Sequence, residues 1–274
     1  ERFSAKDKLS GIATLFQKGY LHNPSRAWLY YGGLYAATVR ELGVKNPKCV
    51  LIETLDPRGC VLAAACNELK IPWVAVPANI DSLLAPVEFH EDFHPPFPKN
   101  AKGRFNPETS WLATAHTVFA IAQEEAFYLN NLGISAHWLD YFPDEKLASE
   151  FTAARQKRTP GDFYLLLGSA INPPTRLGLL EQLSFLIENL TVGEKVVVTG
   201  LGTETLPFSH PDIKIEGTVS YERLGELFSQ CKLSWIHQSR GVGALTRIAE
   251  LLLAGVPIIA STHAARSAMH YEGL

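Results

Sequence analysis

The sequence predicts an α/β protein built from two doubly wound domains with parallel sheets. Short apolar runs bounded by turn residues alternate with longer helical patterns, which is typical of strands covered by helices on both faces. This alternation occurs before a polar, charged stretch at 143–161 and starts again after it. With 274 residues, the chain is long enough for two domains of ordinary size. We therefore predict domains at 1–158 and 159–274.

The first half begins with two predicted helices, over 3–20 and 26–42. Gly32 and Gly33 lie inside the second helix, and we expect a helix break or a close packing contact there rather than a sugar-binding loop. The strand pattern begins only after this helical pair. Strands are expected at 49–53, 73–76, 118–122 and 136–139, and helices at 57–69 and 123–132.

Residues 77–107 form the longest irregular segment of the first half, and they include four prolines between 86 and 98. His90, Glu91, Asp92 and His94 cluster within this segment. Two prolines follow directly and prevent the helix that would place these side chains on one face. We therefore expect a solvated loop that faces the acceptor, and no metal site.

The second half repeats the alternation with clearer boundaries. Residues 168–174 are expected to form a loop after the first strand, and Gly200 and Gly202 a turn after the second. No G-x-G-x-x-G dinucleotide fingerprint follows any strand. Strands are expected at 163–167, 195–199, 213–217 and 233–236, and helices at 176–189 and 221–230.

Bulk composition excludes several classes of protein. The net charge of −3 gives no reason to expect nucleic acid as a partner. The four cysteines have no CxxC spacing and are expected to be reduced thiols of a cytoplasmic protein. No apolar run approaches the roughly 20 residues that span a bilayer. Peripheral contact with a membrane surface stays open.

A stretch near the end of the chain, 239–261, carries the strongest functional signal. Gly241 and Gly243 allow backbone amides to approach a ligand closely, and Thr246 is expected to cap or open the helix that follows. Glu250 lies inside this helix among apolar neighbours. Gly255 ends the helix, and Pro257 lies at the start of a strand, where proline is tolerated.

This stretch resembles the donor-nucleotide motif of retaining GT-B glycosyltransferases of the family 4 type, and the resemblance covers roughly residues 160–262. It implies a GT-B fold, with two Rossmann-like domains facing a cleft and a chain truncated at both ends. It also implies that Glu250 binds the ribose and that Arg176 neutralises the donor diphosphate, and we assign these two as catalytic residues. The remaining predicted donor-binding residues are Gly168, Gly200, Gly202, Arg240, Gly241, Val242, Gly243, Ala244, Leu245 and Thr246.

Three positions are weighed against simpler interpretations. Asn79 follows the 73–76 strand, where the family often offers a histidine to the sugar, and we predict an acceptor-side role for it. Arg240 and Arg247 are more often ordinary surface charges, although either would also serve the diphosphate.

The predicted function is that of a metal-independent retaining hexosyltransferase, which moves a sugar from a nucleotide donor to a glycan, lipid or small-molecule acceptor. No cofactor is expected, and a UDP-sugar is the favoured substrate. The alternative is a catalytically inactive GT-B relative that acts as a nucleotide-binding or regulatory partner. Residues 237–249 contain no acid, so the first glutamate of the family's pair is missing. An epimerase acting on sugar nucleotides is a third candidate.

Overall fold

The computed structural model describes residues 3–22, 27–83, 93–97 and 106–271, and the chain divides into two compact units, Glu1–Asp140 and Tyr141–Leu274. This division lies before the junction that we predict at 158/159. The difference is helix α6 (Glu145–Gln156), which packs on helices of the second unit. Its Phe151 ring lies 5.1 Å from that of Phe228.

The first unit contains a four-stranded parallel sheet in the order β1-β2-β3-β4. All four strands begin within two residues of their predicted starts. The strands are β1 (Val50–Ile52), β2 (Trp73–Ala75), β3 (Thr117–Ala120) and β4 (Ala136–Trp138). The helical elements are α1 (Ala5–Gln17), α2 (Ala27–Lys45), α3 (Pro57–Leu69), η1 (Asp81–Leu83), α4 (Pro107–Leu112) and α5 (Gln123–Asn131).

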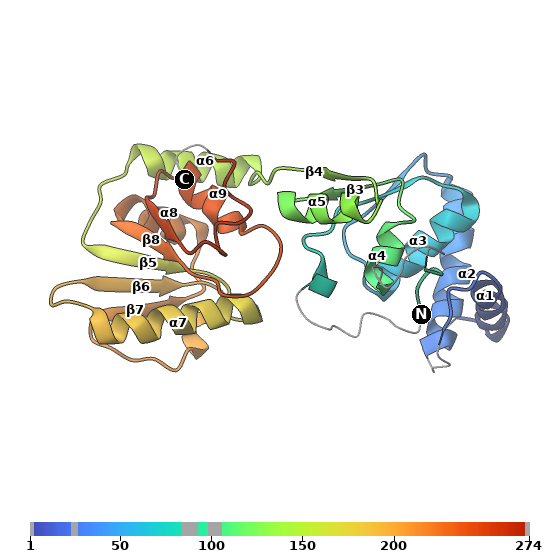
Figure 1. Ribbon diagram of the computed structural model, residues 1–274, viewed down its shortest axis with the longest axis horizontal. Coiled ribbons are helices and arrows are strands. Elements are labelled where there is room, and N and C mark those ends of the chain that lie inside the picture. Colours follow the sequence, from blue (N-terminus) through green and yellow to red (C-terminus); the bar gives the residue numbers. More distant parts are fainter. Residues whose placement is uncertain (1–2, 23–26, 84–92, 98–105, 272–274) are drawn as a thin grey trace. The chain divides into compact units, whose positions relative to one another are not determined.

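Helices α1 and α2 pack side by side in the first unit (Figure 1). A Cβ added to Gly11 would lie 1.9 Å from the carbonyl oxygen of Gly32, so the two helices touch through backbone atoms. Gly32 lies within α2 rather than in a loop. The close-packing interpretation of the glycine pair is therefore confirmed.

The segment between β2 and β3 differs from the solvated loop that we predict, in the parts that are described. Phe93 is fully buried and pairs with Leu21 in an isolated antiparallel bridge. The backbone amide of His94 donates to the carbonyl of Tyr20 at 2.9 Å. Aromatic packing therefore draws this part of the segment into the core, while His90, Glu91 and Asp92 lie outside the described residues.

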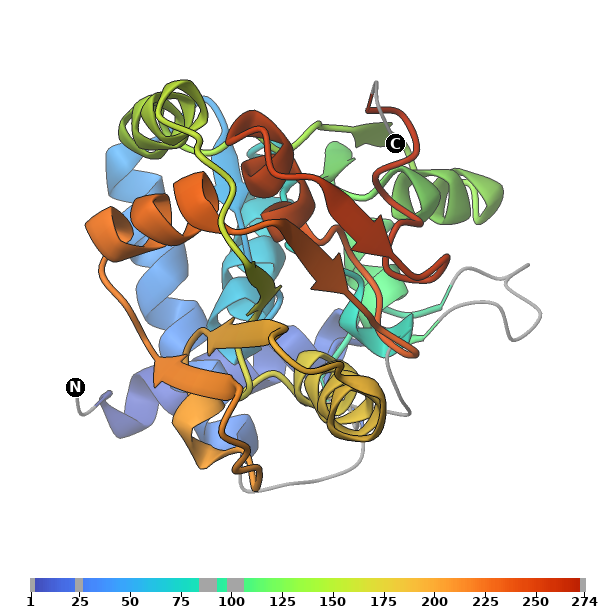
Figure 2. The same cartoon turned by 90° about the vertical axis from the view of Figure 1, so that its left-hand side faces the viewer.

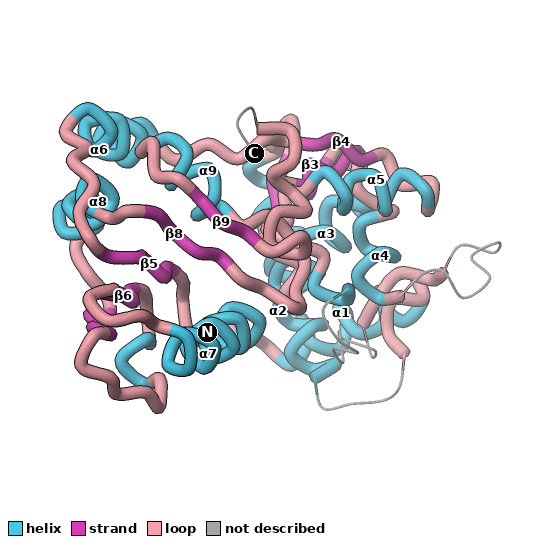
Figure 3. Tube along the Cα trace, turned by 60° about the vertical axis from the view of Figure 1, so that its left-hand side comes forward, coloured by secondary structure: helices cyan, strands magenta, loops and turns pink. Residues whose placement is uncertain are grey.

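The second unit contains a five-stranded parallel sheet in the order β7-β6-β5-β8-β9. Figure 3 shows β6, β5, β8 and β9 side by side. The strands are β5 (Phe163–Leu167), β6 (Lys195–Thr199), β7 (Ile213–Gly217), β8 (Leu233–Ile236) and β9 (Ile258–Ala260). The further helical elements are α7 (Pro173–Asn189), η2 (Thr203–Thr205), α8 (Tyr221–Gln230) and α9 (Thr246–Leu253).

Helices cover both faces of this sheet. Helix α7 packs through Leu179, Leu183 and Leu186 on one face, whereas α6, α8 and α9 share a core on the other. Figures 1 and 2 show α7 on the opposite side of the strands from α6 and α8. The strands are covered on both sides, which explains why they appear in the sequence as continuous apolar runs.

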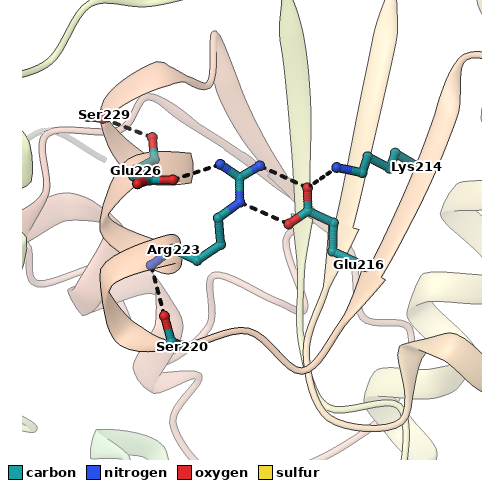
Figure 4. A network of polar contacts seen from close by, with 6 residues as sticks. All are labelled: Lys214, Glu216, Ser220, Arg223, Glu226 and Ser229. Carbon is teal, nitrogen blue, oxygen red and sulfur yellow. Dashed lines mark hydrogen bonds and ion pairs between the residues drawn. The ribbon is translucent and has the colours of Figure 1, made fainter.

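A polar network joins β7 to the start of α8 (Figure 4). Arg223 contacts Glu216 through Nε at 3.0 Å and Nη2 at 2.9 Å, and its Nη1 contacts Glu226 at 2.8 Å. Lys214 adds a second ion pair to Glu216 at 2.9 Å. Ser220 caps α8 by accepting from the amide of Arg223. These contacts fix the beginning of α8 at the end of β7.

Candidate nucleotide-binding site

The predicted donor residues lie mainly at the carboxyl edge of the second sheet, which is the edge where parallel α/β sheets bind ligands. Three loops follow strands at this edge: the loop after β5, the turn after β6 and the glycine loop after β8, defined here as residues 239–245. Gly168, Gly200 and Gly202 come from the first two loops. Residues 241–245 come from the third, and Thr246 follows as the first residue of α9.

The loops after β5 and β6 touch through their glycines. A Cβ on Gly200 would lie 2.1 Å from the carbonyl oxygen of Gly168, and Gly200 has a φ of 135°. Gly202 has a φ of 80°, and a Cβ there would lie 2.8 Å from the side chain of Ile171. Only glycine fits both the space and the backbone conformation at these two positions. The turn after β6 is therefore pressed against the loop after β5.

The glycine loop reaches α9 without a side-chain cap. Leu245 occupies the N-cap position and has no side-chain acceptor, and Thr246 is the first helical residue. Of the two predicted roles of Thr246, the structure confirms that it opens the helix. Because the first amides of a helix have no partner within the helix, an uncapped start provides donors and a positive dipole end for an anion.

Arg247 is the side chain that most clearly lacks a partner at this edge. Its Nε is shielded from solvent, and no acceptor among the described residues bonds to it. Its Nη1 lies 3.4 Å from the position of a Cβ on Gly168, at the end of β5. Burial lowers the pKa of Arg247 to about 10, with the neighbouring Arg266 lowering it further and Glu250 opposing the shift. Arg247 is thus a partly buried cation whose Nε is shielded from solvent and has no acceptor among the described residues.

Glu250 lies three residues after Arg247 on α9 and therefore on the same face of that helix. Its Oε1 accepts a hydrogen bond from the Tyr141 hydroxyl at 3.0 Å. Burial raises the pKa of Glu250, while the bond from Tyr141 and the charge of Arg247 act in the opposite direction. The second carboxylate oxygen is not used by Tyr141, so the group can still accept from a ligand.

The side chain of Arg176 is hydrogen-bonded to Thr205 of η2 in this structure. It lies in the first turns of α7, and its Nη1 donates to Thr205 Oγ1 at 2.8 Å. Its Nη2 donates to the carbonyl of Thr205 at 3.3 Å. The guanidinium holds the η2 turn in this structure, and its catalytic role stays a prediction. Arg240 is exposed in the glycine loop.

Asn79 belongs to the first unit and follows β2. Its side-chain amide donates to the carboxylate of Asp81. Backbone amides of this loop donate to two buried carboxylates, at 3.0 Å to Glu125 and at 3.1 Å to Glu108. Burial raises the pKa of Glu108. The loop that carries Asn79 is thus firmly held, and the acceptor-side role stays a prediction.

From the sequence, Tyr141 has no predicted role, and Arg247 is expected to be an ordinary surface charge or, as the alternative, a ligand of the diphosphate. The spacing of Arg247 and Glu250, three residues apart in a predicted helix, is a signal that would have placed them together. No pattern would have found Tyr141, because 109 residues separate it from Glu250. Among the described residues, no group of three or more His, Cys, Asp or Glu side chains is arranged to hold a metal ion.

Comparison with known proteins identifies the fold. No protein-family model matches the chain, and no curated protein matches it significantly. A solved structure of α,α-trehalose-6-phosphate synthase from Burkholderia multivorans matches 96% of this chain and 68% of its own, with 13% identity and a TM-score of 0.57. That likeness establishes the GT-B fold.

Two other solved structures resemble the chain less closely. UDP-GlcNAc 2-epimerase from Methanocaldococcus jannaschii has 14% identity over 87% of this chain and 67% of its own, with a TM-score of 0.47. MurG from Acinetobacter baumannii has 13% identity over 88% and 61%, with a TM-score of 0.45. The chain spans 68%, 67% and 61% of the lengths of these three solved structures. No described helix is both long and apolar enough to cross a membrane.

Proposed function

We propose that this chain forms the nucleotide-sugar site of a metal-independent retaining glycosyltransferase of the family 4 type, with a UDP-hexose as the first donor to test. The observation that carries the proposal is Arg247. It is a shielded guanidinium with an unpaired Nε at the uncapped start of α9, three residues before a carboxylate on the same helix. A cation and a carboxylate in that order suit the diphosphate and the ribose of one nucleotide.

In this proposal Arg247 and the amides at the start of α9 hold the diphosphate. During transfer the bond between the sugar C1 and the phosphate oxygen breaks, and the acceptor oxygen bonds to C1 on the same face. The departing diphosphate takes the acceptor proton. Arg247 stabilises the charge that develops on this leaving group, which is the step where fixed cations contribute most.

Glu250 receives the two ribose hydroxyls in this proposal. A carboxylate has about four acceptor positions on its two oxygens, so the bond from Tyr141 leaves room for both hydroxyls. The turn after β6, with Gly200 and Gly202, lies at the same edge of the sheet, and we propose that it borders the base. Arg176 would support this turn through Thr205.

One feature favours a second candidate, a GT-B relative that binds nucleotide without transferring sugar. Residues 237–249 contain no acid. Both candidates require nucleotide binding, and they differ in turnover. Release of UDP from UDP-glucose, UDP-galactose or UDP-N-acetylglucosamine, with and without an acceptor extract, separates them.

The test of the binding site is calorimetry with UDP, GDP, ADP and inorganic pyrophosphate. The variants are Arg247→Met and Glu250→Gln, with the exposed residues of the same unit Lys157→Met and Glu188→Gln as charge-matched controls. Arg247→Met should weaken both UDP and pyrophosphate by about tenfold to a hundredfold, as expected for lost charge-assisted bonds. Glu250→Gln should weaken UDP alone.

Two results would contradict the proposal. Failure of the wild-type chain to bind any nucleotide would remove the donor site altogether. Equal loss of pyrophosphate affinity in the Glu250 variant would remove the ribose assignment while leaving the diphosphate site.

A further inference from the structure

The segment after β9, residues 261–266, runs alongside the glycine loop and contacts it in sequence order. Ser261 Oγ accepts from the amide of Gln238 at 3.3 Å. Further along, His263 Nε2 donates to the carbonyl oxygen of Gly241 at 3.0 Å. Because β8 and β9 are parallel neighbours, the loops that leave them continue in the same direction, which makes these ordered contacts a consequence of the sheet.

Arg266 makes the third contact and ties several backbone groups together. Its Nη2 donates to the carbonyl oxygen of Gly243 at 2.7 Å. Its Nη1 donates to the carbonyl of His263 at 2.6 Å and to Gln238 Oε1 at 3.3 Å. The planar guanidinium presents five donors in a rigid fork, whereas the three donors of an ammonium group all lie on a single nitrogen and have no fixed plane.

The two contacts determine where the amides of the loop point. In a trans peptide, the carbonyl and the next amide point in opposite directions, and the described residues contain no cis bond. Holding the Gly241 carbonyl toward His263 therefore turns the Val242 amide away from the 261–266 segment. In the same way, holding the Gly243 carbonyl toward Arg266 turns the Ala244 amide away from it.

These two amides are available to a ligand. Neither the Val242 nor the Ala244 amide bonds to any acceptor in the described part of the chain. Gly241 and Gly243 have φ values of 120° and 74°, which side-chain-bearing residues rarely adopt. Backbone amides that converge from such loop conformations bind anions. The loop thus presents two donors just before the uncapped start of α9.

Arg266 and Arg247 use their hydrogen-bond donors differently. Arg266 uses its donors on the protein's own carbonyls, whereas Arg247 has an Nε without an acceptor. The two cations are close enough for Arg266 to lower the pKa of Arg247, so an anion placed near them relieves a repulsion between like charges. A substitution at Arg266 therefore needs a control that keeps its charge.

We propose that His263 and Arg266 are positioning residues that hold the carbonyls of Gly241 and Gly243 and so aim the Val242 and Ala244 amides at a diphosphate. The inference rests on the proposed nucleotide site and adds a reason why the glycine loop binds its ligand. It assigns the recognition of the diphosphate to two elements, α9 and the segment after β9.

The test uses the full chain and four variants, Arg266→Met, Arg266→Lys, His263→Leu and His263→Gln. Pyrophosphate and UDP affinities are measured by calorimetry, and amide hydrogen exchange is followed over residues 239–246. Arg266→Met and Arg266→Lys should both weaken pyrophosphate by about tenfold and speed exchange in the loop. Lysine keeps the positive charge but lacks the planar set of guanidinium donors. If Arg266→Lys does not restore binding, Arg266 therefore acts by positioning the loop and not by electrostatic attraction of the diphosphate alone.

His263→Gln keeps an N–H donor and should retain most of the affinity that His263→Leu loses. This pair keeps the proposal testable where a variant of Arg266 does not fold. Unchanged loop exchange and unchanged pyrophosphate affinity in folded Arg266→Met would overturn the proposal. Full affinity in Arg266→Lys would overturn it as well. If the wild type binds neither probe but Arg266→Met still speeds loop exchange, the nucleotide site is wrong and the carbonyl contacts stand.

Discussion

The hydroxyl of Tyr141 donates a hydrogen bond to Glu250 Oε1 at 3.0 Å, and Tyr141 is the first residue of the second compact unit. Burial, followed by the charge of Glu250, raises the pKa of Tyr141 to about 12, so this hydroxyl stays a donor throughout the ordinary pH range. The residue that begins the unit thus orients the carboxylate to which we assign the ribose.

Tyr141→Phe should move the pH dependence of UDP binding. Burial raises the pKa of Glu250 and the bond from Tyr141 lowers it, so removing the hydroxyl raises that pKa further. The carboxylate then becomes protonated at a higher pH, and UDP affinity should fall off at a higher pH than in the wild type. Calorimetry between pH 5 and 8 measures this, with pyrophosphate as the ligand that should not respond. If UDP affinity falls at the same pH in both proteins, Tyr141 does not act through Glu250.

Glu216→Gln should remove part of the acid sensitivity of the second unit. The hydrogen bonds from Arg223, with a smaller contribution from Lys214, lower the pKa of Glu216 from its ordinary value near 4.5 to about 2 (Figure 4). A lowered pKa contributes stability above the unfolded value, and this contribution is lost as the pH falls from about 4.5 toward 2. Because solvent screens these partly exposed ion pairs, the free energy of unfolding at pH 7 should drop by about 1 to 2 kcal/mol in the variant.

Urea unfolding at pH 7 and pH 3 tests this directly. The difference between wild type and Glu216→Gln should be large at pH 7 and much smaller at pH 3. Glu188→Gln, on the exposed side of α7, serves as the control and should match the wild type at both values. A difference that stays constant with pH would mean that the ion pairs do not carry the effect.

Arg158→Met should destabilise the second unit by about 1 to 3 kcal/mol, because several backbone carbonyls would lose the charged donor to which they are hydrogen-bonded. Arg158 Nη2 donates to the carbonyls of Cys231 at 2.8 Å and Lys232 at 3.2 Å, and Nη1 donates to Phe228. These carbonyls lie at the carboxyl end of α8, where a helix lacks internal donors. Thermal unfolding measures the change, with Lys157→Met as the control. An unaltered melting temperature would show that water replaces the guanidinium without loss.

Gly178→Ala and Gly225→Ala should change stability in opposite directions, although both glycines lie in helices. A Cβ on Gly178 would lie 2.2 Å from the His237 carbonyl oxygen, so α7 must move away from the end of β8. A Cβ on Gly225 meets nothing within 4 Å. The first change should lower the melting temperature, and the second should raise the free energy of unfolding by about 0.5 to 1 kcal/mol. Equal effects would mean that α7 can shift freely.

Most strands of both sheets can be predicted from the sequence, because parallel strands buried on both faces appear as continuous apolar runs. The predicted bounds of β5, β6, β7, β8 and α8 match the structure. Helix α6 was missed, since its polar residues suggested a domain junction. Its apolar positions, Leu147, Phe151 and Ala154, nonetheless follow helical spacing, and they pack into the core of the second unit.

The sequence by itself determined the alternation of strands and helices, the glycine loop and the glutamate of α9, because these depend on local conformation and on periodicity along the chain. Tertiary structure alone decided which side chains meet. Tyr141 reaches Glu250, Arg266 reaches the glycine loop from beyond β9, and Arg247 is left without a partner for its Nε. Contacts between distant residues depend on strand order and loop direction, and the spacing of residues along the sequence predicts neither of them.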